Sequence, residues 1–294
     1  MSFITYLING ISLGSIYALI ALGYTMVYGI AKMLNFAHGD VIMVGAFTVY
    51  TLCSILGLPP VVGVLIAVAF CTALGMGIEK MAYKPLRKAS SPLAVLITAI
   101  GVSYLLQNLA LLIFGANTKS FTSVISMEPI KLADGQISIS GETIVTIIVC
   151  ILIIIGLMLF INKTKMGQAM LAVAEDKGAA QLMGINVDGT IALTFAIGSA
   201  LAAVAGVLLC SAYPSLTPYT GSMPGIKAFV AAVFGGIGSI PGAFIGGILL
   251  GIIEIFGKAY ISSQLSDAIV FAVLIIVLLV KPTGLLGKNI QEKV

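Results

Sequence analysis

The chain has 294 residues, of which 60% are hydrophobic and only 9% are charged. An ordinary soluble domain carries about 25% charged residues, so this composition excludes a soluble globular protein and indicates a membrane protein. The formal net charge of +4 is too modest to indicate nucleic acid as a partner. The four cysteines lie in apolar segments without a CxxC pair, so we expect small buried side chains rather than disulfides or metal ligands.

Long apolar segments predict an all-α polytopic membrane protein that forms a single domain over residues 1–294. A bilayer core of about 30 Å needs roughly 20 apolar residues per helix, and these runs are too continuous for the alternating strands of a barrel. The first 31 residues carry no charge, so the first span is expected to remain as a membrane helix. Residues 225–257 are apolar but interrupted, so we expect eight passages, or nine if this stretch crosses twice. The remaining predicted spans are residues 5–30, 41–57, 61–78, 93–114, 143–161, 190–210 and 267–281.

The first predicted break, residues 35–40, separates two apolar spans without a conventional polar loop. Its polar and glycine residues predict that Asn35, His38 and Gly39 shape a transport pathway or a gate. His38 is the only histidine in the chain, and no further metal-ligand spacing accompanies it. Considered alone, it indicates a structural, hydrogen-bonding histidine, so we expect neither a metal site nor a catalytic site.

The next features are a polar cluster in the fourth span and the loop that follows it. Ser103, Gln107 and Asn108 should face protein or water, and both interhelical hydrogen bonding and lining a pathway remain open for them. Residues 115–142 form the one substantial outer loop, where Asp134-Gly135 predicts a small hairpin. This hairpin could receive a partner protein or simply cover helix ends.

Residues 162–190 are the only long polar segment expected to face the cytoplasm. We predict two short helices, the second beginning at Lys177 with Asp176 as its cap and ending at Gly184. Such a shape is suited to docking in a groove of a partner. The alternative is an interfacial helix resting on lipid, which the acidic pair at the bend disfavours. The predicted coupling residues are Ala174, Glu175, Asp176, Ala179 and Gly184.

Small residues at four-residue spacing predict tight helix packing, because close backbone approach replaces the hydrophobic effect between helices in lipid. The stripes are Gly10-Gly14-Ala18, Gly198-Ala202-Gly206, Gly242-Gly246 and Gly247-Gly251.

A second predicted break, residues 235–242, lies inside an apolar run and must interrupt a helix. Such breaks often occur at transport pathways or gates, although a plain tight hairpin is the alternative. The predicted gate residues are Gly235, Gly236, Gly238, Ser239 and Pro241. Lys227 and Glu254 flank the break, and either their mutual pairing or a watery cavity around them is expected, since a lone intramembrane charge costs about 2.5–3.5 kcal/mol.

The placement of basic residues predicts the orientation of the chain. When the loops are taken alternately, one set holds most of the lysine and arginine residues and should be cytoplasmic. The amino terminus is then outside and, if residues 225–257 form a hairpin, the carboxyl terminus is inside. The basic residues of the cytoplasmic set are Lys32, Lys80, Lys84, Arg87, Lys88, Lys163, Lys165, Lys177, Lys281, Lys288 and Lys293.

Five stretches carry a resemblance to a known family: residues 7–30, LNFAHGD at 34–40, AEDKGAAQLMGIN at 174–186, 191–209 and 235–251. Over essentially its whole length the sequence resembles the permease subunit of branched-chain amino acid ABC importers. The last three stretches also look like parts of sugar permeases. LNFAHGD points to the branched-chain amino acid branch, although urea and short-amide permeases share similar forms. Residues 174–186 stand at the ATPase-coupling loop but depart from its better-known signature, so only the role is carried over.

The resemblance implies a machine of several chains. Two permease subunits, often different ones, form the pathway, two cytoplasmic ATPases drive it, and an external binding protein delivers the substrate. The sequence contains no G-x-x-x-x-G-K-[ST] loop, so we expect no enzymatic activity and no cofactor in this chain. We predict a bacterial inner-membrane permease for leucine, isoleucine and valine. The alternatives are a urea or short-amide permease of the same family, and a stand-alone secondary transporter, which would not explain residues 162–190.

Overall fold

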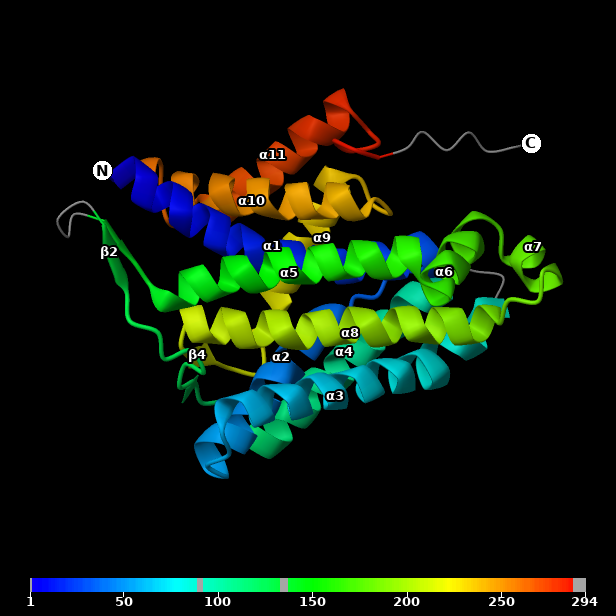
Figure 1. Ribbon diagram of the computed structural model, residues 1–294, viewed down its shortest axis with the longest axis horizontal. Helices are drawn as coiled ribbons and strands as arrows, with labels where there is room; N and C mark the ends of the chain where they lie inside the picture. The colour runs from blue at the N-terminus through cyan, green and yellow to red at the C-terminus, as the bar shows by residue number, and fades with distance from the viewer. Residues whose placement is uncertain (1, 89–91, 133–136, 288–294) are drawn as a thin grey trace.

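The structure is a computed structural model that describes residues 2–88, 92–132 and 137–287, and it is a bundle of roughly aligned helices (Figure 1). Its long helices are α1 (Ser2–Ala31), α3 (Pro60–Ile78), α4 (Pro92–Phe114), α5 (Gly141–Lys163), α8 (Val187–Ala212) and α10 (Ile240–Tyr260). The shorter ones are α2 (His38–Val49), α6 (Lys165–Glu175), α7 (Lys177–Leu182), α9 (Ser222–Gly235) and α11 (Ser266–Val280). A π-helical turn, η1 (Tyr50–Ile55), extends α2, and η2 (Glu79–Tyr83) and η3 (Lys84–Lys88) extend α3.

The predicted all-helical membrane fold is confirmed, but the predicted number of passages is not. Within the described residues, seven helical segments are long and apolar enough to cross a membrane. The helices α9 and α11 have only 14 and 15 residues, whereas a full crossing needs roughly 20. The structure therefore does not confirm the count of eight to nine passages, because α9 and α11 are shorter than a full span.

Among the described residues, the contact between α1 and α10 is the most extensive between two helices. The two helices run antiparallel, and a Cβ atom added to Gly10 would lie 2.9 Å from the Ile252 Cα atom. At Gly14 it would lie 2.7 Å from the Ile248 Cα atom, and at Gly247 it would overlap the Ala18 backbone. The predicted small-residue stripes are thus confirmed at the backbone level, because no larger side chain fits between these helices.

The first predicted break is confirmed between α1 and α2. Residues 32–37 are not helical, and they bring the chain back beside Gly23, about two turns before the end of α1. The helix α9 also begins beside the start of α2, where a Cβ atom on Gly39 would lie 2.8 Å from the Gly221 carbonyl oxygen. Two short helices therefore begin within the bundle, next to each other.

Two small antiparallel sheets lie at the end of the bundle where α1 begins (Figure 1). Strand β1 (Lys119–Ser120) pairs with β4 (Ser215–Leu216), and β2 (Ile130–Leu132) pairs with β3 (Ile137–Ile139). The second pair confirms the predicted hairpin, while its turn at Asp134-Gly135 lies outside the described residues.

Residues 236–239 join α9 to α10 as a tight turn, so the interrupted segment is a helical hairpin whose first limb is short. Gly236 and Gly238 have φ angles of 107° and 91°, which favour glycine. The turn is covered by the chain after α11, because Leu285 N donates to Phe234 O and Leu286 N to Gly235 O, each at 2.9 Å. Residues 284–287 therefore lie at the same end of the bundle as this turn.

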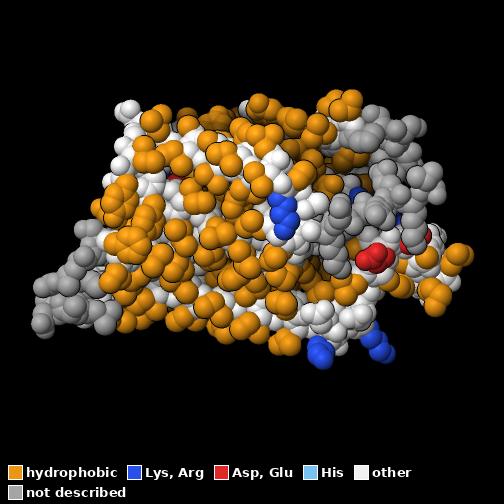
Figure 2. Space-filling model, turned by 90° about the horizontal axis from the view of Figure 1, so that it is seen from above, with side chains coloured by type: hydrophobic (Ala, Val, Ile, Leu, Met, Phe, Trp, Pro, Cys, Tyr) orange, Lys and Arg blue, Asp and Glu red, His pale blue; other side chains and the backbone are white. Residues whose placement is uncertain are grey.

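The outer surface is largely hydrophobic, as Figure 2 shows for one face. The visible lysine and arginine side chains of that face lie in its right-hand half, towards the end that carries α6 and α7 in Figure 1. Leu112 on α4 is 83% exposed and Leu152 on α5 is 64% exposed. Such a surface requires lipid or another apolar chain around it.

We expect Gly247→Ala to lower the Tm of the purified protein by several degrees more than the matched change Gly156→Ala. Both changes replace a helical glycine and share the same gain in helix propensity. At Gly247 the new methyl group overlaps the Ala18 backbone, and such overpacking costs about 1–3 kcal/mol, whereas nothing lies within 4 Å of a Cβ atom at Gly156. A thiol-reactive fluorophore can follow unfolding, because Cys71, Cys150 and Cys210 are buried. Equal Tm values would contradict this packing argument.

Candidate functional site

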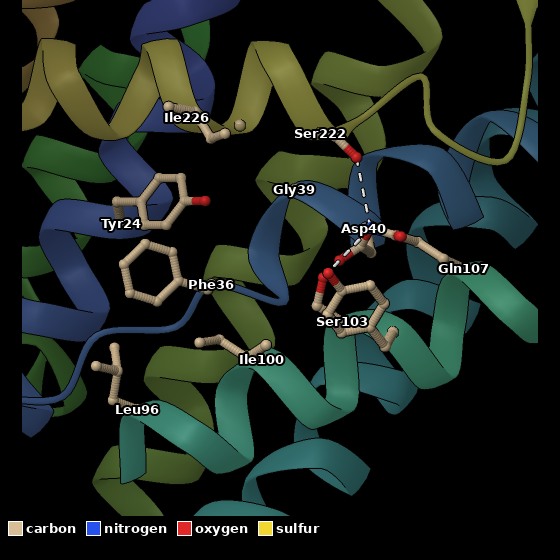
Figure 3. A pocket seen from close by; sticks show the side chains of 12 residues that line it. Tyr24, Phe36, Gly39, Asp40, Leu96, Ile100, Ser103, Gln107, Ser222 and Ile226 are labelled. Atoms are coloured by element: carbon tan, nitrogen blue, oxygen red, sulfur yellow. Dashed lines mark hydrogen bonds between the residues drawn. The ribbon is translucent and has the colours of Figure 1, made fainter. Parts of the chain in front are cut away.

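A cavity of about 500 Å³ opens among α1, α2, α4 and α9 (Figure 3). The two non-helical segments that come before α2 and before α9 meet at this cavity. The cavity is lined by Tyr24, Phe36, Gly39, Asp40, Leu96, Ile100, Ser103, Tyr104, Gln107, Ser222, Gly225 and Ile226.

One end of the cavity is polar and centres on Asp40 in the first turn of α2. Gln107 Nε2 donates a hydrogen bond to Asp40 Oδ1 at 2.9 Å, and it lies 3.4 Å from the hydroxyl oxygens of Ser103 and Ser222. The Asp40 residue is only 2% exposed. None of the ion pairs formed by the described residues involves Asp40.

The other end of the cavity is apolar. Figure 3 shows Phe36, Leu96, Tyr24 and Ile226 on the side away from Asp40. The rings of Tyr24 and Phe36 each pack against Phe229 with centroids 5.7 Å apart, which fixes this wall. The cavity can therefore hold a solute that is polar at one end and hydrocarbon at the other.

Glycine residues allow the two helix starts to approach. A Cβ atom on Gly225 would lie 2.8 Å from the Gly39 Cα atom, and one on Gly39 would lie 3.4 Å from the Gly225 Cα atom. Substitution at either position would push α2 and α9 apart and change the cavity. Gly39, a predicted pathway residue, does line the cavity.

The other two residues predicted from the first break lie behind the cavity wall. His38 is 1% exposed, packs edge-on against Tyr24 with centroids 4.7 Å apart, and fits beside α1 because Gly23 has no side chain. Its Nε2 atom has no hydrogen-bond partner among the described residues. Asn35 Oδ1 accepts a hydrogen bond from the buried Tyr83 hydroxyl at 2.9 Å.

Sequence reasoning missed Asp40, Tyr24 and Ser222 as cavity residues. The available signal was Asp40 itself, an acidic residue at the start of an apolar span in a chain with only 11 acidic residues. Ser103 and Gln107, which were left open, both hydrogen-bond to Asp40 of α2 and line the cavity. Asn108 is exposed and donates to the Tyr104 carbonyl oxygen at 2.7 Å instead.

The second set of predicted gate residues is placed away from the cavity, in the α9–α10 turn. A Cβ atom on Gly29, near the end of α1, would lie 3.2 Å from the Gly238 Cα atom. Ser239 Oγ accepts from Gly242 N at 3.2 Å and caps α10, and Pro241 stands in its first turn. Gly235 packs directly against Gly242. The five predicted residues are therefore brought together, but at the end of the bundle.

The predicted pairing of Lys227 with Glu254 is confirmed, with 2.8 Å between Lys227 Nζ and Glu254 Oε1. Asp267 also contacts Lys227 at 2.7 Å, and Lys258 contacts Glu254 at 2.6 Å, so two positive and two negative groups balance. The Tyr17 hydroxyl donates to Glu254 Oε2 at 2.8 Å. This group of ion pairs, the Lys227 cluster, anchors α9 to α1, α10 and α11. Residues of α9 that come before Lys227 line the cavity.

The predicted helix pair in residues 162–190 is confirmed. Asp176 Oδ1 accepts from Ala179 N at 2.9 Å at the start of α7, and Gly184, with a φ angle of 82°, ends that helix. Glu175, Asp176, Ala179 and Gly184 are exposed, while Ala174 is half-buried.

The helix pair is fixed to the bundle from both helices. In α6, Met170 and Val173 are buried in the core. In α7, Lys177 Nζ donates to the carbonyl oxygen of Ala31, the last residue of α1, at 2.8 Å. Burial lowers the pKa of Lys177, and the nearby charges of Arg87 and Lys32 lower it further. Leu182 and Met183, by contrast, are 90% and 82% exposed and form an apolar tip beyond the bundle.

No three His, Cys, Asp or Glu side chains of the described residues come together in a way that could hold a metal ion.

A sequence profile for the permease component of branched-chain amino acid transport systems matches residues 6–278. The high-affinity branched-chain amino acid transport system permease protein LivH of Escherichia coli (strain K12) is 46% identical over 302 residues, covering 99% of this chain and 98% of that protein. BraD of Pseudomonas aeruginosa, of the same description, is 45% identical, with coverage of 99% and 98%. Among solved structures, PsaBC from Streptococcus pneumoniae in complex with Fab matches with a TM-score of 0.50 and 15% identity, covering 95% of this chain and 91% of that one. The last likeness concerns the fold alone.

We expect Gly23→Ala to lower the Tm, because its methyl group would overlap the His38 imidazole. Crowding in a packed core costs about 1–3 kcal/mol. The double variant Gly23→Ala/His38→Ala should recover stability relative to Gly23→Ala alone, since the smaller side chain leaves room. Gly101→Ala, with nothing within 4 Å of a Cβ atom, is the matched control. If the double variant is no more stable than the single one, His38 is not what Gly23 accommodates.

Proposed function

Because the chain belongs to the family of permease components of branched-chain amino acid transport systems, we propose that it forms the membrane pathway through which leucine, isoleucine and valine enter the cell. The observation that carries this proposal is the 46% identity to LivH over 99% of the chain. The cavity supports it, because a volume of about 500 Å³ with one polar and one apolar end suits an amino acid with a branched hydrocarbon side chain.

We further propose that separate subunits supply energy and substrate. The partners would be a second, related permease chain, two cytoplasmic ABC ATPases and an external binding protein, within the lipid bilayer. The absence of a phosphate-binding loop from the sequence supports ATP hydrolysis in other chains. The exposed apolar faces of α4 and α5 would meet lipid or the second permease.

The proposed location is the bacterial inner membrane, with the amino terminus outside and the carboxyl terminus in the cytoplasm. This orientation rests on the excess of basic residues at the end of the bundle that carries α6 and α7. Lys163, Lys165 and Lys177 belong to that end, together with Lys84 and Arg87 of η3.

Reconstitution tests the proposed function. The permease pair, the ATPases and the binding protein are placed in proteoliposomes, and uptake of labelled leucine is compared with uptake of urea. We expect leucine uptake that depends on ATP and survives collapse of the proton gradient. Urea uptake would favour a short-amide permease, and leucine uptake without the ATPases would favour a stand-alone secondary transporter.

We propose that Asn35, His38 and Gly39 shape the pathway, and that the α9–α10 turn at Gly235, Gly236, Gly238, Ser239 and Pro241 serves as a gate. Gly39 contributes directly to the cavity wall, whereas His38 supports Tyr24, which lines it. The turn joins α9 to α10, and it touches both α1 and the residues after α11. A change in its shape would therefore displace these three helices and the chain after α11.

Gly238→Val tests the gate. Its φ angle of 91° strains any β-branched residue by about 1–3 kcal/mol, while a Cβ atom there would meet the Gly29 Cα atom at an ordinary contact distance of 3.8 Å. We expect at least a tenfold loss of leucine uptake with the complex still assembled. Gly115→Val, which introduces similar strain at a φ angle of 77° in the outer loop, is the matched control and should retain most uptake. Equal uptake by the two variants would make the turn an ordinary connection.

We also propose that residues 166–184 dock on the ATPases and transmit their closure to the pathway. The helix pair is fixed at one side through Met170, Val173 and the Lys177–Ala31 contact, and presents Leu182 and Met183 at the other. A rigid insert can pass motion to the spans that flank it, and the direct contact with the end of α1 offers a route towards the cavity.

Single cysteines at Ala172, Ala179 and Gln181 test the docking. We expect cross-links to the ATPase from the exposed Ala179 and Gln181 positions, fewer from the half-buried Ala172 position, and none from Gly115 at the opposite end. Gly184→Pro should insert normally but uncouple hydrolysis from the loaded binding protein, because proline removes the Gly184 N–H bond to Gln181 O and cannot adopt a φ angle of 82°. Cross-links from Leu286 but from none of the loop positions would exclude this loop as the coupling element.

A further inference from the structure

We infer that the Asp40 carboxylate binds the ammonium group of the transported amino acid at the polar end of the cavity. This inference rests on the proposed function, and it adds a chemical requirement that the function does not itself contain: the solute must carry a cationic amine.

The argument starts from the buried acidic residues. Three of them are buried among the described residues: Asp40, Glu79 and Glu254. Glu254 pairs with Lys227 and Lys258, and Glu79 pairs with Arg87. Asp40 differs, because no ion pair of the described residues includes it. A buried carboxylate without a cation is costly, and the cost falls when a ligand supplies the missing charge.

The surroundings of Asp40 are suited to an ammonium group. Gln107 Nε2 donates to Asp40 Oδ1 at 2.9 Å, and the carboxylate also accepts from the Ser103 side chain and the Asp40 backbone N–H, so that of its roughly four lone-pair sites one stays free for a ligand. The hydroxyl oxygens of Ser103 and Ser222 each lie 3.4 Å from the same Gln107 nitrogen, and the Ser103 hydroxyl is hydrogen-bonded to the carboxylate. An ammonium group donates three hydrogen bonds and prefers such a set of oxygen acceptors.

The rest of the cavity fits the remainder of the solute. Phe36, Leu96, Ile100 and Ile226 provide hydrocarbon contacts away from Asp40, as Figure 3 shows. The separation of charge and hydrocarbon matches an aliphatic amino acid. It does not match urea or a short amide, because neither carries an ammonium group, so the site would also explain selection within the family.

A protection experiment tests the inference without relying on uptake. The permease–ATPase complex is prepared without the external binding protein, with Cys53→Ser and a reporter cysteine at Ile100, and the rate of thiol labelling is measured. Three probes are compared at millimolar concentration: leucine, 3-methylbutylamine and 4-methylpentanoate. We expect the two amines to slow labelling and the acid without an amine to have no effect.

Asp40→Asn should raise the leucine concentration that gives half-protection by about tenfold or more, since one charge-assisted hydrogen bond contributes roughly 1.4 kcal/mol or more. Asp40→Glu, which keeps the charge, should restore part of the protection. If Asp40→Asn does not fold, the comparison of amines with 4-methylpentanoate on the unchanged carboxylate still decides the question.

Protection by 4-methylpentanoate equal to that by leucine, protection by sodium or potassium ions alone, or an absence of protection would each overturn the inference. These results leave the proposed function intact if reconstituted vesicles still accumulate leucine. Vesicles that accumulate urea and no amino acid would overturn the proposed function and the ammonium site together.

Discussion

The structure depends on how closely two helix backbones can approach in lipid. Between helices in a bilayer the hydrophobic effect contributes little, so stability must come from contact between the helices themselves. Along α1 and α10 the glycine positions leave no room for even one methyl group, and the same holds where α2 begins beside α9. Glycine lets α1 and α10 pack closely as the scaffold of the bundle. At α2 and α9, it lets two helices begin side by side around a cavity.

Buried charged groups also hold the helices in place. The Lys227 cluster contains equal numbers of positive and negative groups and ties α9 to three other helices, so a partial helix can remain in place within the bundle. That support lets the start of α9 present Ser222 and Gly225 to the cavity. Asp40 is a buried acid without a counterion among the described residues, and it lies where a solute can reach it.

Local features of the fold could be predicted from the sequence because they depend on neighbouring residues. The small-residue stripes, the cap at Asp176, the stop at Gly184 and the pairing of Lys227 with Glu254 each follow from short-range chemistry. The cavity could not be predicted, because Tyr24, Asp40, Gln107 and Ser222 come from four helices whose arrangement no local pattern specifies. The passage count is not confirmed for a related reason: apolar length does not reveal that a helix such as α9 starts within the bundle.

The contact between the chain after α11 and the end of α9 has a consequence for biogenesis. Among the described residues, the carbonyl groups of Phe234 and Gly235 accept from the backbone N–H groups of Leu285 and Leu286, which are synthesised about fifty residues later. Helix-end carbonyl groups have no partner within their own helix, so the α9–α10 hairpin gains these two hydrogen bonds only after α11 and the residues behind it have been synthesised. The contacts of this turn are therefore completed from the carboxyl-terminal end of the chain.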